Sequence, residues 1–310
     1  MNFKKPSFWD LKKPNFLSFL LIPLSLPVII RNFFFIFFRK KSFSEIKTIC
    51  LGNIYLGGTG KTPLTIKIYE ILKKKGLNIA TVKKFHSNQI DEQRLLKQKT
   101  SLIISKKRIN AVFEGIKRKV DILIFDDGLQ DFQINYDKKI VCFKSENWIG
   151  NGRIIPAGPL RQGIKSLKYF DAAILNGKSD DIKKIEYEIK KVNNNIKIFR
   201  TYYKIHNINN YDIDSNYLIF SGIGNPSDFK NLLKENNFKI SKEVIFPDHY
   251  TYKENEIENI INIANKENRK IITTEKDYTK IPSNFKNKIN FLEIELIINN
   301  ENELINLLLN

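Results

Sequence analysis

Cysteine is nearly absent from this sequence of 310 residues. The only two, Cys50 and Cys142, stand far apart, and neither has a second cysteine at C-x-x-C spacing. This scarcity excludes a disulfide framework and a cysteine-based metal site, and it favours a reducing compartment. Both cysteines lie in apolar, strand-like runs, where a thiol is most simply a core side chain.

Acidic residues are also few. The chain has 33 Asp and Glu against 52 Lys and Arg, which gives a formal net charge of +19 and a pI near 9.6. Such a balance favours anionic partners: a nucleotide, a phosphorylated lipid, an anionic membrane surface or a nucleic acid. The sequence lacks zinc-finger spacing and the aromatic-plus-basic signature of RNA-binding modules, so we expect no nucleic-acid partner.

A membrane-spanning helix needs about 20 uninterrupted apolar residues, and the chain has no such run. It comes nearest at the N-terminus, where residues 16–30 are apolar except for two serines and two prolines, and residues 33–38 are all Phe or Ile. Arg31 interrupts the stretch, and three cations follow it at residues 39–41. We therefore expect an apolar membrane-anchor helix that lies on the surface, with its aromatic side chains in the lipid. A spanning helix is the alternative.

The rest of the chain is organised around a glycine-rich turn at residues 51–63, which reads L-G-N-I-Y-L-G-G-T-G-K-T-P. The turn lies between a strand-like run, 46–51, and a helix-like run, 64–75, which is the context that a phosphate-binding loop needs. Glycines allow successive backbone N–H groups to surround an anion, and the helix N-terminus adds partial positive charge. The residues expected to bind ATP are Tyr55, Leu56, Gly57, Gly58, Thr59, Gly60, Lys61 and Thr62.

Two residues of this loop carry its chemistry. We expect Lys61 to neutralise the β- and γ-phosphates and the Thr62 hydroxyl to bind Mg²⁺. The usual spacing has a glycine where this chain has Tyr55, so Gly57 and Gly58 are expected to shape the entry of the loop.

A second motif consists of an apolar strand, 121–126, that ends in Asp126 and Asp127. A carboxylate at the end of such a strand meets the Mg²⁺ ion bound beside a phosphate loop. We therefore predict a metal site made by Thr62, Asp126 and Asp127. The alternative for Asp127 and Gly128 is a simple Asp-Gly turn.

Strand-like and helix-like segments alternate along the chain. This pattern predicts an α/β fold with a mostly parallel, P-loop NTPase-like sheet flanked by helices, and a second, smaller α/β domain. A polar, Asn-rich stretch indicates a linker between them. The expected divisions are an N-terminal membrane-associated segment at 1–41, a P-loop kinase domain at 42–201, a linker at 202–216 and a smaller C-terminal α/β domain at 217–310.

Seven short motifs follow one another along nearly the whole chain. They are G-N-x-x-x-G-G-T-G-K-T-P at 52–63, D-E-x-x-L-L at 91–96, D-D-G-x-Q at 126–130, G-R-x-x-P-A-G-P-L-R at 152–161, G-I-G-N-P at 222–226, F-x-D-H at 246–249 and T-T-E-K-D at 273–277. Together they resemble the tetraacyldisaccharide 4'-kinases of lipid A biosynthesis. Each motif alone is weak, but seven in this order are specific.

The resemblance implies a phosphotransferase that moves the γ-phosphoryl group of ATP, with Mg²⁺, to the 4'-hydroxyl of a tetraacylated glucosamine disaccharide 1-phosphate. It implies that Asp91 is the catalytic base, paired with His249, and that Lys61 completes the catalytic set. Arg161 and Gln130 are candidates for substrate binding, since a guanidinium can bind phosphate through two hydrogen bonds. The implied partners are the acylated lipid and the inner-membrane surface, on the cytoplasmic face of a bacterial inner membrane, with peripheral or monotopic attachment.

The residues alone leave other functions open. The main alternative is a membrane-associated P-loop ATPase, or a kinase that acts on another acceptor. An ATPase switch of the deviant-loop kind carries a lysine just before the paired glycines, where this chain has Leu56. Apart from the resemblance, Asp91 reads as a helix N-cap and His249 as a loop histidine.

The chain departs from the family pattern at three places. Residues 83–89 lack the Arg-Gly-Tyr-Gly segment that usually follows the second strand. Asp131 stands where a histidine is usual, and Gln162 stands where a glutamate is usual. All three departures fall on the acceptor side of the expected site.

Overall fold

The computed structural model describes residues 5–34, 41–86, 90–131, 133–177, 180–248 and 250–310. The chain forms two compact units. The larger unit comprises Met1–Lys84, Thr100–Tyr202 and Ile298–Asn310, and the smaller comprises Phe85–Lys99 and Tyr203–Ile297. These boundaries differ from the sequence-based ones, because residues 85–99 group with the smaller unit and the C-terminal helix groups with the larger.

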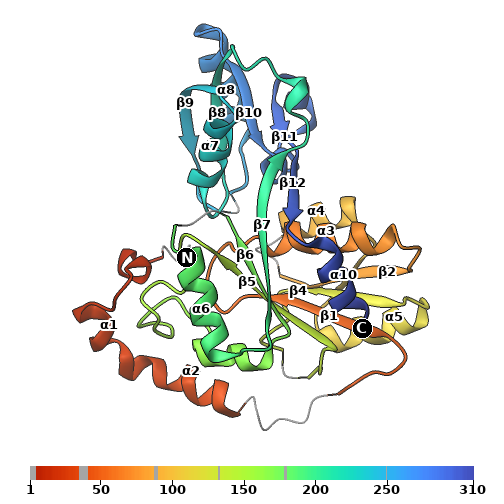
Figure 1. Cartoon of the computed structure of the whole chain (residues 1–310). Coiled ribbons are helices and arrows are strands. Elements are labelled where there is room, and N and C mark those ends of the chain that lie inside the picture. The colour runs from red at the N-terminus through yellow and green to blue at the C-terminus, as the bar shows by residue number, and fades with distance from the viewer. Residues whose placement is uncertain (1–4, 35–40, 87–89, 132, 178–179, 249) are drawn as a thin grey trace. The chain divides into compact units, whose positions relative to one another are not determined.

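An eight-stranded sheet has the order β12-β7-β6-β5-β1-β4-β2-β3, and its strands from β6 to β3 lie wholly in the larger unit (Figure 1). The ladders from β7 to β3 are all parallel, which confirms the predicted α/β fold with a mostly parallel sheet. The strands are β1 (Lys47–Gly52), β2 (Ile79–Lys84), β3 (Leu102–Ser105), β4 (Ile122–Asp126), β5 (Lys138–Lys144), β6 (Ala172–Asn176), β7 (Lys197–Ile205) and β12 (Ile294–Ile298). Strand β7 continues through residues 202–205, which the sequence assigned to the linker.

Helices cover both faces of this sheet. They are α3 (Lys61–Lys73), α5 (Arg108–Lys117), α6 (Ile182–Val192) and α10 (Glu301–Leu309). From β1 the chain crosses by α3 to β2, and from β3 it returns by α5 to β4. These two crossovers run in opposite directions along the sheet, so the usual right-handed connection places α3 and α5 on opposite faces.

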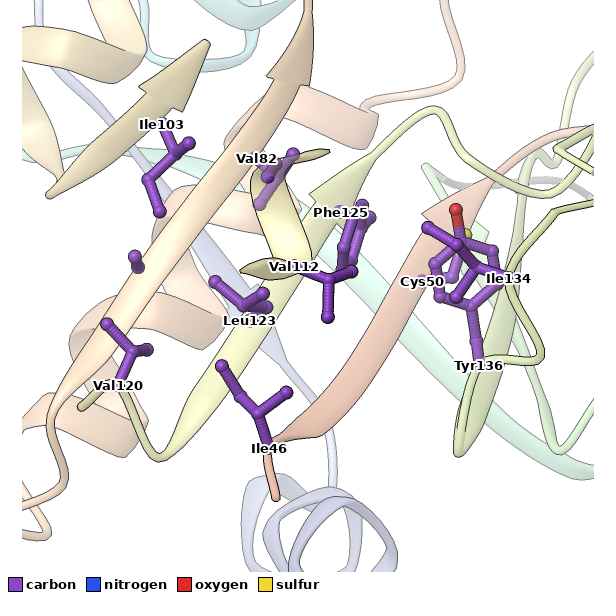
Figure 2. Packing of buried hydrophobic residues seen from close by; sticks show 12 residues of the cluster. Ile46, Cys50, Val82, Ile103, Val112, Val120, Leu123, Phe125, Ile134 and Tyr136 are labelled. Atoms are coloured by element: carbon purple, nitrogen blue, oxygen red, sulfur yellow. The ribbon is translucent and has the colours of Figure 1, made fainter. Parts of the chain in front are cut away.

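One hydrophobic core lies between α5 and the strands that carry the expected site. Figure 2 shows Leu123 and Phe125 of β4 on this side, together with Cys50 of β1 and Val112 of α5. All four side chains are fully buried. Strands β1 and β4 are buried almost throughout because helices pack on both sides of them, which explains the consecutive apolar residues at 49–51 and 122–125.

The smaller unit is a second α/β layer. Its four-stranded parallel sheet has the order β11-β10-β8-β9, with β8 (Asn216–Ser221), β9 (Lys239–Ile245), β10 (Lys270–Thr274) and β11 (Asn290–Leu292). Its helices are α4 (Ile90–Lys99), α7 (Pro226–Glu235), α8 (Glu254–Lys266) and α9 (Glu275–Tyr278). Helix α4, which carries the D-E-x-x-L-L motif, packs against α9. The motif therefore belongs to the smaller unit, although the sequence places it inside the kinase domain.

The N-terminal segment is not one anchor helix. It forms a 3₁₀ turn, η1 (Ser7–Asp10), and two short helices, α1 (Phe16–Leu20) and α2 (Ile22–Phe34), with Pro27 inside α2. Among the residues that the structure describes, no helix has the length and apolar character needed to cross a bilayer. The expected aromatic run at 35–38 and the cations at 39 and 40 lie outside the described residues.

Candidate active site

The glycine-rich turn connects the end of β1 to the start of α3. Gly60 caps α3 with a left-handed backbone, φ 80°, which a residue with a side chain rarely adopts. Asn53 closes the loop, because its side-chain amide donates a hydrogen bond of 3.0 Å to the carbonyl of Gly57. The first N–H groups of α3 have no partners inside the helix, so they are available to an anion in the loop.

Tyr55 takes the position where the usual spacing has glycine, and its side chain is only 3% exposed. Its hydroxyl donates a hydrogen bond to Asp10 and accepts one from Lys5, and its backbone forms a bridge with Leu160. Burial, together with the acceptor Asp10, raises the pKa of Tyr55. The phenol therefore fastens the loop to the N-terminal segment, which leaves the backbone of Tyr55 as its means of contacting a nucleotide.

The parallel register between β1 and β4 sets Leu51 beside Asp126, so the acidic end of β4 lies next to the phosphate loop. Thr62 Oγ1 donates a 3.2 Å hydrogen bond to Asp126 Oδ2. The other carboxylate oxygen, Oδ1, is buried and has no hydrogen-bond partner. The structure thus brings together two of the three residues predicted to hold a metal.

Asp127 faces cations rather than Thr62. Arg161 Nη1 lies 3.1 Å from both of its carboxylate oxygens, and Lys61 Nζ lies 3.9 Å from Oδ1. Its backbone has φ 61°, which agrees with the alternative of an Asp-Gly turn. Burial acts to raise the pKa of Asp127, but Lys61, Arg161 and Lys83 outweigh it, so the pKa falls well below its usual range. Asp127 therefore stays ionised, and its carboxylate pairs with both Lys61 and Arg161.

The two candidate substrate residues belong to one hydrogen-bond network. Gln130 donates a hydrogen bond of 2.8 Å to the carbonyl of Asn53 and accepts one of 3.2 Å from Arg161. The backbone carbonyl of Arg161 in turn accepts a hydrogen bond of 2.8 Å from Asn32 of α2. The network ties the phosphate loop to the Arg161 segment and to the N-terminal helices within the larger unit.

Sequence reasoning missed two cations at this site. Lys83 of β2 contacts Asp126, and Arg108 at the start of α5 donates to the carbonyl of Asp127 and lies 3.4 Å from Asp131. The ion pair with Arg108 accounts for an acidic residue at position 131. Lys83 had a signal, since it follows the apolar part of its strand and, unlike the next residue Lys84, is buried. The position of Arg108 depends on the fold and has no local signal.

The predicted catalytic pair falls mainly outside the described part of the chain. The backbone of Asp91 lies in α4, but its side chain is not among the described ones, and His249 is outside the described residues. Their sequence neighbours do meet a common residue of the smaller unit. Lys276 Nζ lies 4.0 Å from Glu92 and 3.4 Å from Asp248. The base assignment thus stays a prediction.

The donor set around Asp126 fits magnesium. Among the described residues, no group of three or more His, Cys, Asp and Glu side chains is placed to hold a metal. Mg²⁺ does not require one, because it usually keeps several waters and combines one or two protein oxygens with substrate phosphates. Thr62 Oγ1 and the unpartnered Asp126 Oδ1 are oxygens of this kind.

A sequence model of the family described as Tetraacyldisaccharide-1-P 4'-kinase matches residues 17–310. The chain belongs to this family. It is 47% identical over 311 residues to a Tetraacyldisaccharide 4'-kinase of Pelagibacter ubique, covering 100% of this chain and 98% of the relative. It is 34% identical to the enzyme of that name from Rickettsia canadensis, covering 96% and 94% of the two chains.

The fold has a counterpart among solved structures. The crystal structure of LpxK from Aquifex aeolicus, in complex with ATP, superposes with a TM-score of 0.73 at 20% identity and covers 94% of this chain and 98% of that chain. This likeness shows the fold. With the family membership, the chain is a kinase, and the resemblance noted in its seven motifs is confirmed.

Proposed function

We propose that the chain transfers the γ-phosphoryl group of ATP to the 4'-hydroxyl of a tetraacylated glucosamine disaccharide 1-phosphate at the cytoplasmic face of a bacterial inner membrane. The acceptor follows from the name of its relatives. The observation that carries the proposal is that the phosphate loop, the acids of β4 and a pair of outward-facing apolar helices belong to the same unit. A nucleotide site and a lipid-facing surface are what a lipid kinase has to combine.

The N-terminal helices support the membrane part of the proposal because their polar side chains face the protein and their apolar side chains face outward, the reverse of an ordinary surface helix. Their serines face the protein: Ser18 and Ser25 are at most 2% exposed, and they bond to Asn151 and to the carbonyl of Ile154. Their apolar side chains face outward, namely Phe16, Leu17, Phe19, Leu20, Leu24, Leu26, Ile29, Ile30, Phe33 and Phe34. An apolar face of this extent indicates contact with a nonpolar phase.

The cations of the loop supply the electrostatics of phosphoryl transfer. Lys61 would neutralise the transferred group, and Arg161 lies close enough to Lys61, through Asp127, to add a second positive charge. Thr62 and Asp126 would hold a Mg²⁺ ion, which would supply positive charge to neutralise the phosphates of ATP. Because these groups are partly buried, their charges are screened less by water than surface charges are.

The acceptor hydroxyl also needs a proton acceptor. We assign this role to Asp91, with His249 as the group that orients it and stabilises the proton it takes up. The position of Lys276 supports this pairing, since one ammonium contacts the immediate neighbours of both residues in the smaller unit.

The test is a comparison of two acceptors. In vesicles with ATP and Mg²⁺, we expect ADP to form only when the acylated disaccharide 1-phosphate carries a free 4'-hydroxyl, and not with its 4'-deoxy analogue. Equal ADP formation with both lipids, or without lipid, would favour the alternative of a membrane-associated ATPase. Turnover with a different hydroxylated lipid alone would indicate a kinase for another acceptor.

A further inference from the structure

The buried lysine at the end of β2 is a feature that the proposed reaction does not yet use. Lys83 lies opposite Asp126 in the parallel register of β2 and β4, so both side chains emerge on the same side of the sheet. Lys83 Nζ is 2.6 Å from Asp126 Oδ2, and the two side chains are 4% and 0% exposed. Removing two charges from water costs several kcal/mol per ion, so a pair this deep needs close contact to persist.

The two oxygens of the Asp126 carboxylate differ in their partners. Oδ2 accepts from both Lys83 and Thr62, whereas Oδ1 is buried and has no partner. A carboxylate fixed through one oxygen cannot rotate freely, so the position of the other oxygen is set by the protein. Mg²⁺ needs near-ideal octahedral geometry, and a preset oxygen favours its binding.

We propose that Lys83 is a positioning residue for the metal site: it holds Asp126 by Oδ2 so that Oδ1 remains available to the Mg²⁺ ion that accompanies ATP. Lys83 acts through Asp126 and not on the nucleotide. The inference rests on the proposed nucleotide site but not on the identity of the lipid acceptor. It can therefore fail while the acceptor assignment stands, and the reverse is also true.

The experiment measures nucleotide binding without any lipid. A fluorescent ATP analogue is titrated into the full chain, first with a chelator and then over a range of Mg²⁺ concentrations. Loss of an outer partner of a metal ligand typically weakens metal affinity about 10- to 100-fold. For Lys83→Met we expect a loss of this size in the apparent Mg²⁺ affinity and a change of less than about twofold in metal-free binding, with Lys83→Arg restoring most of the Mg²⁺ effect.

Two comparisons separate this role from a general loss of charge or stability. Lys139→Met removes the same charge from another strand of the same sheet, β5, where Lys139 bonds to Asn135, and should leave the Mg²⁺ affinity unchanged. In an Asp126→Asn background, adding Lys83→Met should have no further effect on Mg²⁺ affinity, because the group through which Lys83 acts has already been altered.

Three results would overturn the inference. The first is a Lys83→Met variant whose Mg²⁺ affinity is within about twofold of the wild-type value, since the expected loss is at least tenfold. The second is an equal loss of metal-free ATP binding, which would place Lys83 on the nucleotide itself. The third is a further loss in the Asp126→Asn background, and that double variant, which lacks both buried charges, also decides the matter if Lys83→Met alone does not fold.

Discussion

Replacing the outward apolar side chains of the N-terminal helices should release the protein from membranes without unfolding it. Phe16 is 80% exposed, and Leu20 and Leu24 are each 63% exposed, so their change to serine removes little internal packing. Full burial of one such side chain is worth about 1.5–3 kcal/mol. Scaled by these exposures, complete transfer of the three into lipid is worth about 3–6 kcal/mol.

A surface-lying helix buries only one side of its circumference in the bilayer. If about half of that area enters the lipid, the triple serine variant loses about 1.5–3 kcal/mol of membrane affinity. Since 1.4 kcal/mol corresponds to a factor of ten, binding to vesicles should weaken about 10- to 100-fold. Co-sedimentation with vesicles that contain anionic phospholipid, over a range of lipid concentrations, measures this directly.

A control variant separates the helices from exposed apolar residues in general. Tyr187 and Ile245 are 65% and 60% exposed and lie outside the N-terminal segment, so their change to serine should leave vesicle binding unaltered. Circular dichroism should show the same melting temperature for all three proteins within about 2 °C, since exposed substitutions change stability by only about 0.5 kcal/mol. Unchanged sedimentation of the triple variant would refute the idea that these helices form the membrane contact.

Three further changes test the site. Asp91→Asn should abolish transfer to lipid while ATP binding persists in a filter assay; transfer at a near-normal rate would remove Asp91 from the role of base. Gly128→Ala should lower the free energy of unfolding by about 1–3 kcal/mol in urea titrations. The reason is that a Cβ there would lie 2.8 Å from both the Cys50 sulfur and the Tyr136 hydroxyl, whereas Gly163→Ala meets no atom within 4 Å and should be neutral. Asp127→Asn should cost stability at neutral pH. Because the pKa of Asp127 is lowered in the folded chain, the cost should shrink as the pH falls below about 4, the ordinary pKa of an aspartate, and a cost independent of pH would contradict the ion-pair network.

The main architecture could be predicted from sequence because it depends on local patterns. The strands expected at 46–51 and 121–126 correspond to β1 and β4, since each run ends at a motif that the sequence makes recognisable. Helix α4 begins at Ile90, so Asp91 lies in its first turn and not at the N-cap that its sequence suggested. Strand β9 has no comparable local pattern, because it lies at the edge of its sheet and is rich in charged residues.

The candidate site was only partly predictable. Lys61, Thr62 and Asp126 occur in patterns whose spacing follows from the chemistry of phosphate binding, and the structure places them together. Lys83 and Arg108 reach the same acids from elements that are adjacent only after folding. No spacing rule along the chain can reveal such contacts.

The N-terminal helices, whose serines face the protein, show a second limit of prediction from sequence. In sequence, Ser18 and Ser25 are interruptions of an apolar run, but in the fold they are the residues that attach this run to the protein. Their partners, Asn151 and the carbonyl of Ile154, belong to a segment more than 120 residues away. The apolar pattern indicated lipid contact, but which side would face the protein depended on those distant partners.

The most direct measurement follows the fate of the terminal phosphate of ATP. The full chain is incubated with ATP labelled at the γ-position, Mg²⁺ and the acylated disaccharide 1-phosphate in vesicles, and the lipid and aqueous phases are then separated and counted. We predict that the label appears in the lipid phase, bound at the 4'-position, and that Lys61→Met abolishes this incorporation. Label recovered only as free phosphate, with none in the lipid, would contradict the assignment of this chain as a lipid kinase.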